Sequence, residues 1–213
     1  MHGLTIDHLV LGPVSTNVYI VSNPGTKECV IIDPATNPST ILKKTEGAGL
    51  KLKAILLTHG HFDHILAVND IEEITGVPVY AHADERQILA HPDVGLMYRD
   101  LSDKAVTDYT EVHDNDVLDL IGFKWKVIHT PGHSAGSVVY YVESEKLMFS
   151  GDTVFRGSYG RTDLMTGSFE DISKSIKEKI FTIPDDDVDI LPGHMEFTKL
   201  GFEKRNNMIL LDL

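Results

Sequence analysis

The first half of the chain alternates short apolar runs with stretches in which apolar residues recur at helical spacing. Three runs, Val18–Val21, Cys29–Ile32 and Ala54–Leu57, have the length and composition of buried strands. Between the second and third, Pro38 to Ala48 predicts a helix, because proline is favoured in the first helical turn. This order indicates sheet strands covered by helices.

A second helix and a further strand are predicted after the third run. The helix extends as far as Gly76, and its apolar positions are Ile65, Leu66, Val68, Ile71 and Ile74. Val77–Ala81 then resumes a strand. The first half therefore follows a β-α-β-α-β order, which is typical of a sheet with helices packed on it.

The second half of the chain repeats this pattern. Phe169 to Phe181 predicts an amphipathic helix, because isoleucine occupies every fourth position from Ile172 to Ile180. Another helix is expected after Thr198. Short strands are predicted at Val117–Leu120, Trp125–Ile128, Ser137–Tyr141, Leu147–Phe149 and Val188–Leu191. Two sheets, each with an outer helical layer, would account for this order of elements.

Length and composition indicate one globular domain over residues 1–213, with 42% hydrophobic and 24% charged residues. No apolar run approaches the roughly 20 residues of a membrane span, and the N-terminus lacks the pattern of a signal peptide. We therefore expect a cytoplasmic protein without a membrane partner. The net charge of −13 argues against nucleic acid as a partner. Cys29, the one cysteine, lies in an apolar run and is expected in the core.

The segment from His59 to His64 has the highest density of side chains that can bind a metal. It has the spacing H-x-H-x-D-H and follows the apolar run Ala54–Leu57. It places His59, His61, Asp63 and His64 at the mouth of a buried strand. Imidazole and carboxylate are ligands for zinc and similar divalent metals. Four donors in six residues are too crowded for one ion and suit two.

Three further segments each place one donor just beyond a predicted strand. His133 follows a Pro-Gly turn, Asp152 follows Ser150-Gly151, and His194 follows Pro192-Gly193. Glycine and proline supply sharp turns that direct a side chain back over the edge of a sheet. One such histidine is more often structural, but three segments together with the dense cluster favour a shared metal centre.

A count of the donors gives a consistent site for two ions. His59, His61 and His133 can surround one ion, and Asp63, His64 and His194 can surround the other. Asp152 is the natural bridge, since one carboxylate can span ions about 3.5–4 Å apart. This arrangement leaves each ion a position for a shared water, which hydrolysis requires.

These motifs, T-H-G-H-F-D-H over residues 58–64, T-P-G-H over 130–133, S-G-D-T over 150–153 and L-P-G-H over 191–194, resemble the metallo-β-lactamase-fold hydrolases. Within that superfamily, the segments 156–163 and 198–203 resemble the single-domain glyoxalase II-like (hydroxyacylglutathione hydrolase-like) branch. The resemblance implies an α/β (α+β) fold, the four-layer αβ/βα sandwich, with a dinuclear site at one edge of the sheets.

The resemblance also implies roles for residues around the metals. Asp33 and Thr58 would support a ligand histidine from behind. Arg161 lies where such enzymes carry a basic residue near the substrate carboxylate, although a surface arginine is the alternative. The position of Tyr159 in the loop after Asp152, rather than the resemblance, is the reason to expect it in the pocket lining. Asp152 stands where the principal zinc β-lactamases have cysteine. The chain ends at Leu213, without the C-terminal helical domain that helps larger glyoxalase II enzymes hold glutathione, so the carrier thiol stays open.

The expected function is hydrolysis of a small acyl thioester, of the S-hydroxyacylglutathione kind, by a hydroxide bridging two divalent ions. Asp63 and Asp152 would act in catalysis together with this metal-bound water. Zinc fits the donors best, and iron or manganese would bind the same set. The sequence leaves the oligomeric state open.

Several alternatives share the fold. A persulfide dioxygenase would bind a single iron through His59, His133 and Asp152. Another esterase or lactonase of the superfamily would use the same donors. A metal-dependent nuclease is disfavoured by the acidic charge. A non-enzymatic interaction module would be expected to have lost ligands, whereas all seven donors are present here.

Overall fold

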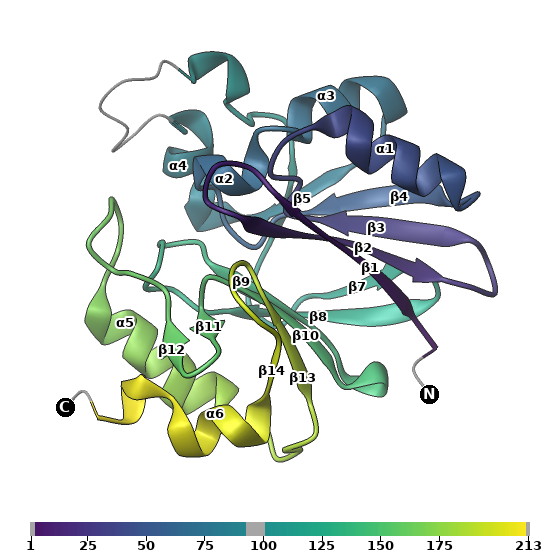
Figure 1. Ribbon diagram of the computed structural model, residues 1–213. Helices are drawn as coiled ribbons and strands as arrows, with labels where there is room; N and C mark the ends of the chain where they lie inside the picture. The colour runs from purple at the N-terminus through teal and green to yellow at the C-terminus, as the bar shows by residue number, and fades with distance from the viewer. Residues whose placement is uncertain (1–2, 93–100, 212–213) are drawn as a thin grey trace.

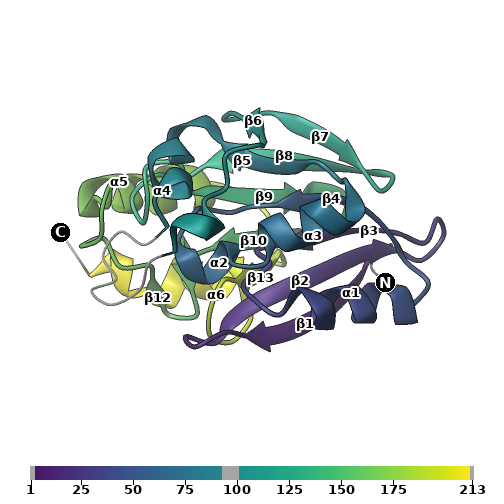
Figure 2. The same ribbon diagram turned by 90° about the horizontal axis from the view of Figure 1, so that it is seen from above.

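The computed structural model describes residues 3–92 and 101–211. Two six-stranded sheets face each other, and helices cover the outer face of each sheet (Figures 1 and 2). The fold is therefore the expected four-layer αβ/βα sandwich. Among the described residues, no helix is long and apolar enough to cross a membrane.

The first sheet has its strands in sequence order. Antiparallel pairing joins β1 to β2 and β2 to β3, and parallel pairing continues from β3 to β6. Its strands are β1 (Thr5–Leu11), β2 (Thr16–Asn23), β3 (Glu28–Ile32), β4 (Lys51–Leu56), β5 (Val79–His82) and β6 (Thr110–Val112). Its outer face carries α1 (Pro38–Gly47), α2 (Phe62–Ile65) and α3 (Val68–Thr75), while α4 (Arg86–Ala90) lies between β5 and β6 in the chain.

The second sheet runs in the order β14-β13-β10-β9-β8-β7, and β10 and β13 are parallel. Its strands are β7 (Val117–Leu120), β8 (Phe123–His129), β9 (Val138–Val142), β10 (Leu147–Gly151), β13 (Asp189–Pro192) and β14 (Thr198–Lys199). A small pair, β11 (Val154–Phe155) and β12 (Ser158–Tyr159), lies beside it. Its helices are α5 (Phe169–Lys174), continued by η4 (Ser175–Ile180), and α6 (Leu200–Asn206).

Alternation along the strands divides the core into layers. On β2, Tyr19 and Val21 face the second sheet and pack in a cluster with Trp125 and Phe149. Val18 and Ile20, which alternate with them along the strand, belong to the cluster beneath α1 and α3. A third cluster lies between the second sheet and α5 with η4. Cys29 is buried, as expected for a core residue.

Most predicted elements are present, with some differences in extent. The helix expected as far as Gly76 is two helices, because the Ala67 amide donates to the carbonyl of Pro34 at 3.0 Å and so leaves the helical ladder. The helix expected to end at Phe181 changes to π-helical bonding over Ser175–Ile180. β1 was not predicted, since this edge strand is exposed at alternate positions and lacks an apolar run.

Candidate metal centre

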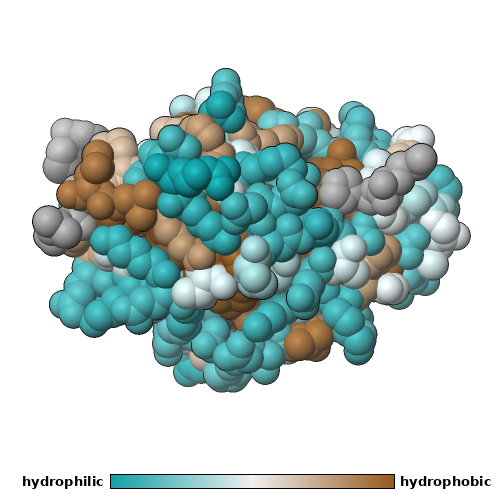
Figure 3. Space-filling view, turned by 90° about the horizontal axis from the view of Figure 1, so that it is seen from below, coloured by the Kyte–Doolittle hydropathy of each residue, from teal (hydrophilic) through white to brown (hydrophobic). Residues whose placement is uncertain are grey.

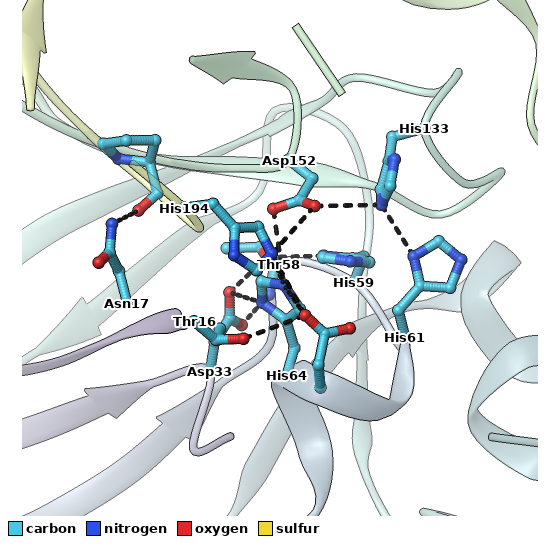
Figure 4. Close-up of polar contacts among 12 residues, drawn as sticks. Thr16, Asn17, Asp33, Thr58, His59, His61, His64, His133, Asp152 and His194 are labelled. Atoms are coloured by element: carbon cyan, nitrogen blue, oxygen red, sulfur yellow. Dashed lines mark hydrogen bonds and ion pairs between the residues drawn. The ribbon is translucent and has the colours of Figure 1, made fainter. Parts of the chain in front are cut away.

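Side chains from both sheets converge at one edge of the sandwich (Figure 4). The segment His59–His64 follows the end of β4, and His133 follows β8. Asp152 follows β10, and His194 follows β13. The structure thus brings together all seven donors that the sequence singles out, from the segments that follow four strands, with Asp63 and His64 in the first turn of α2.

The first group of donors is His59, His61 and His133, whose ligand atoms all lie within 4.8 Å of one another. His61 Nδ1 lies 2.8 Å from His133 Nε2. The other ring nitrogen of His133, Nδ1, donates to the carbonyl oxygen of Arg161 at 2.8 Å. This bond orients the ring and leaves its Nε2 directed at the cluster.

The second group is Asp63, His64 and His194. Asp63 Oδ2 lies 3.2 Å from His194 Nε2 and 3.4 Å from His64 Nε2. The two histidine Nε2 atoms are 3.3 Å apart. Three donor atoms therefore surround a common point from three directions.

Asp152 lies between the two groups (Figure 4). Its Oδ2 is 3.4 Å from His133 Nε2 in the first group and 3.5 Å from His194 Nε2 in the second. Its Oδ1 is 3.5 Å from His64 Nε2. Such a carboxylate can contact an ion on either side, which is the position required of a bridge.

Two observations test whether this cluster fits metal ions. Among the described residues, His59 Nε2 and Asp152 Oδ1 are buried polar atoms without a hydrogen-bond partner, and each such atom is costly unless a ligand satisfies it. In addition, burial and the neighbouring His133 lower the pKa of His61 to about 3, and burial lowers the pKa of His133 to about 4. These imidazoles are therefore neutral near pH 7, the form that binds metals. The donor set fits divalent metal ions.

Asp33 supports the cluster from behind. Its Oδ2 accepts from His64 Nδ1 at 2.9 Å and from the Thr58 hydroxyl at 2.6 Å, and its Oδ1 accepts from the Thr58 amide at 2.8 Å. The Thr58 hydroxyl also lies 3.1 Å from His59 Nδ1. One buried carboxylate thus orients one histidine of each group, which is the support that the resemblance assigns to Asp33 and Thr58.

Strand β2 holds the second group from the first sheet. The Thr16 hydroxyl donates to Asp63 Oδ2 at 3.0 Å. The Asn17 side-chain amide donates to the carbonyls of Pro192 and Met195, on either side of His194, at 2.9 and 3.1 Å. The turn that carries His194 is therefore fixed to the opposite sheet.

Glu85 is a structural component of the site that the sequence analysis did not identify. This carboxylate is 1% exposed and accepts from the Gly60 amide at 2.8 Å, the Gly136 amide at 2.8 Å and the Ser134 hydroxyl at 2.9 Å. It therefore joins the loop of His59 and His61 to the loop of His133. No local signal marks it, because its partners Gly60 and Gly136 lie 25 and 51 residues away in the chain.

Close approach at the centre requires glycine at two positions. A Cβ on Gly193 would lie 2.3 Å from Asp152 Oδ1 and 2.7 Å from His64 Cε1. A Cβ on Gly160 would lie 1.9 Å from the Asp152 carbonyl oxygen. Each substitution would push directly on residues of the cluster.

The cluster opens into a pocket with a volume of about 740 Å³, within the usual range for small-molecule sites. Arg161 and Tyr159, the residues proposed for substrate contact, both line it. Asp163 holds the Arg161 guanidinium through two hydrogen bonds of 2.6 and 2.7 Å. The pocket therefore has one cationic side chain among its described lining residues, and a carboxylate of the chain already binds it.

Another group with metal-binding residue types, His82, Asp84 and His129, lies apart from this centre. The rings of His82 and His129 stack with centroids 3.9 Å apart and planes 13° from parallel. Nitrogen lone pairs lie in the ring plane, so the lone pairs of two stacked rings lie in separate, nearly parallel planes. This pair therefore does not converge on one ion as the main cluster does.

Comparison with known proteins agrees with the geometry. The model of the metallo-beta-lactamase superfamily matches residues 11–194. The chain is 36% identical over 202 residues to the probable metallo-hydrolase YqgX of Bacillus subtilis (strain 168), with 94% of each chain covered. It is 32% identical over 187 residues to hydroxyacylglutathione hydrolase GloC of Haemophilus influenzae, covering 86% of this chain and 88% of the relative.

A solved structure gives the same result for the fold. The crystal structure of BLEG-1 B3 metallo-beta-lactamase is similar with a TM-score of 0.86 and 36% identity, and the match covers 96% of this chain and 99% of that one. The fold, the donor cluster and the family match together lead to one conclusion: the chain belongs to the metallo-beta-lactamase superfamily and is a metallo-hydrolase.

Proposed function

We propose that this metallo-hydrolase cleaves acyl thioesters, the chemistry for which its relative GloC is named. The observation that carries the proposal is the pair of donor groups that share Asp152 at the floor of one pocket. Water adds to the acyl carbon, the carbon–sulfur bond breaks, and the products are a carboxylate, a thiol and a proton released to solvent.

The residues of the two groups would hold two divalent ions. His59, His61 and His133 would hold one, Asp63, His64 and His194 would hold the other, and Asp152 would contact both. Bound there, such ions would supply a water of lowered pKa and an electrophile for the acyl oxygen. The donors suit zinc best, and iron or manganese would bind the same set.

The leaving group supports a thioester over an oxygen ester or an amide. A thiol has a pKa near 8.5, so the thiolate departs without a strong general acid. Among the described residues that line the pocket, Asp63 and Asp152 are the only carboxylates, and both belong to the donor set. Burial opposes ionisation of Asp63, but the neighbouring His64, His194 and His59 together outweigh it and hold the pKa of Asp63 well below its usual range. Asp63 is therefore suited to bind a metal and orient water, and unsuited to donate a proton.

The alternative of a mononuclear persulfide dioxygenase would use His59, His133 and Asp152 alone. It would give no role to the second group, although Thr16 and Asp33 hold that group in place through buried hydrogen bonds of 3.0 and 2.9 Å. This support favours two ions. A cytoplasmic location, a small-molecule substrate and the absence of nucleic-acid and membrane partners stay predictions from the sequence.

Turnover by protein loaded separately with zinc and with iron tests the proposal. We expect hydrolysis of S-lactoylglutathione or a simple acyl thioester, followed by loss of thioester absorbance. Oxygen uptake with glutathione persulfide by the iron form alone, without thioester hydrolysis, would replace the proposal with the dioxygenase. A cephalosporin belongs in the same assay, and its preferred hydrolysis would redirect the proposal to β-lactams.

A further inference from the structure

Most of the residues that line the pocket outside the donor cluster are apolar. Donor side chains form the floor, while hydrophobic side chains come from separate segments of the chain. These apolar residues are Val14, Phe62, Ile88, Phe155, Leu164 and Met195, and Met165 and Pro92 continue the wall. Since no single helix or strand supplies them, their common feature is the pocket that they surround.

Several of these apolar side chains are exposed. Met195 is 64% exposed, Val14 is 48% exposed and Met165 is 40% exposed. Scattered exposed hydrophobic residues are normal, but these gather around one opening next to the metal centre. Burial of such a surface by a hydrocarbon would release water and favour binding.

The protein itself offers few charged side chains to a charged thiol carrier in this pocket. Arg161 is the only lysine or arginine among its described lining residues, and Asp163 already accepts from one edge of its guanidinium, through Nε and Nη2. Asp63 and Asp152 add negative charge, which the metal ions would offset. Glutathione carries two carboxylates, and these would have to compete with Asp163 for the Arg161 guanidinium.

We infer that the physiological substrates are thioesters whose acyl group is an uncharged hydrocarbon chain, and that recognition does not require a charged thiol carrier. The inference rests on the proposed thioester hydrolysis and narrows its substrate class. The acyl carbonyl lies at the donor cluster, and the chain extends along the wall formed by Ile88, Leu164 and Met165.

A series of thioesters on one neutral thiol, N-acetylcysteamine, tests the chain preference with zinc-loaded protein. Acetyl, butanoyl, hexanoyl and octanoyl esters should show a kcat/KM that rises about two- to fourfold per added methylene, the factor for burial of one methylene. S-Lactoylglutathione should be a poorer substrate than the octanoyl ester. A flat series, or a clear preference for S-lactoylglutathione, would overturn the inference and leave thioester hydrolysis standing.

Binding without turnover gives a second, independent measurement. The thioether S-octyl-N-acetylcysteamine cannot be hydrolysed and should bind more tightly than S-methylglutathione in calorimetric titrations, with a negative heat-capacity change. Tighter binding of S-methylglutathione would overturn the inference. Absence of turnover with every thioester would refute the proposed function, and in that case the inferred substrate class falls with it.

Variants of the pocket wall, with a matched control, test where the acyl chain lies. Leu164→Asn should reduce the octanoyl rate at least about tenfold more than the acetyl rate, because it places a polar group on the wall. Met165→Asn, at a more exposed position, gives the same test if the first variant does not fold. Ile74→Asn is the control, since Ile74 is 67% exposed on α3 and does not line the pocket. An unchanged chain-length slope in both wall variants would refute the proposed path of the acyl chain.

Discussion

Each residue of the centre depends on a partner that fixes its direction. His133 is oriented by the Arg161 carbonyl, and His64 is oriented by Asp33. Arg161 thus supports the centre through its backbone carbonyl, and contact of its side chain with a substrate stays a prediction from the sequence. A ligand histidine with one nitrogen bonded to a fixed acceptor presents the other nitrogen to a metal in a defined tautomer.

Substitution His61→Ala tests the ligand assignment. It removes a donor atom of the first group, so we expect bound metal and hydrolysis to fall together, with affinity reduced by more than about 100-fold. Metal analysis after gel filtration and thioester turnover measure the two effects. His113→Ala is the control, because this side chain is 63% exposed and lies outside the cluster. A fully loaded, fully active His61→Ala protein would refute the assignment.

Substitution Asp33→Asn tests the support behind the ligands. It keeps the shape but removes the charge that accepts from His64 and Thr58. We expect metal affinity to fall about 10- to 100-fold, the usual effect of residues behind the ligands, while the protein remains folded. Competition with a metal-binding dye gives the affinity, and circular dichroism checks the fold. Unaltered affinity would show that Asp33 does not orient His64.

At the scale of elements, the segments that follow strands carry the donors, two of them in α2, and other elements hold those segments in place. β2 holds the His194 turn through Asn17, and the turn before α4 holds two loops through Glu85. The glycines allow the loops to approach closely. The geometry of the centre is therefore a property of contacts between elements rather than of any one motif.

Stability should depend on pH through Glu85. Burial raises the pKa of Glu85 to about 7, and bonds from Gly60, Ser134 and Gly136 only partly oppose this. The folded protein then holds this proton more tightly than the unfolded chain, in which the pKa of the glutamate is about 4.5. Its contribution to stability is complete below pH 4.5 and is lost as the pH rises through about 7.

Comparison of the wild type with Glu85→Gln isolates this effect, because glutamine does not titrate. The free energy of unfolding in urea, measured on metal-free protein from pH 5 to 8, should decline more for the wild type than for the variant. A constant difference between the two proteins across that range would contradict the raised pKa.

Substitution Gly160→Ala tests close packing at the centre. The new Cβ would lie 1.9 Å from the Asp152 carbonyl oxygen and 3.0 Å from His133 Nδ1. We expect a loss of about 1–3 kcal/mol in the free energy of unfolding, as in other overpacked sites, together with weaker metal binding. Gly47→Ala is the control, since nothing lies within 4 Å of its Cβ and alanine favours the helix. Equal stability of both variants would refute the prediction.

On the scale of the whole molecule, the donor groups join the two sheets. His59, His61, Asp63 and His64 come from the first sheet, and His133, Asp152 and His194 come from the second. Ions bound there would connect the halves of the sandwich at the edge where Tyr19 also donates to the Pro192 carbonyl at 2.6 Å. Metal binding and stability should therefore be coupled.

Removal of metal should lower the melting temperature. Free metal at 1,000 times its dissociation constant stabilises the folded state by about 4 kcal/mol. For a chain of this size, each kcal/mol changes the melting temperature by about 3 °C. We expect a decrease of roughly 10 °C after chelation, and recovery when zinc is restored. Calorimetry with parallel metal analysis measures it. An unchanged melting temperature after verified removal would refute the coupling.

The sequence by itself determined the layered fold and the residues of the candidate centre. Buried strands such as Cys29–Ile32 are visible as apolar runs, and turns such as Pro192-Gly193 mark where a following side chain can turn back over the sheet. Both signals are local, so they need no knowledge of neighbouring elements. The resemblance to a known family drew on the same local motifs.

Only the tertiary structure decided how those donors are held and what lies above them. Glu85 contacts loops 25 and 51 residues away, and the apolar wall joins Val14 to Ile88, Leu164 and Met195. Two features of the fold also depend on such contacts. Pairing with β2 decides the edge strand β1. The hydrogen bond from Ala67 to Pro34 decides the break between α2 and α3. Contacts between distant segments leave no periodic trace in sequence, since each partner is specified only when the chain has folded.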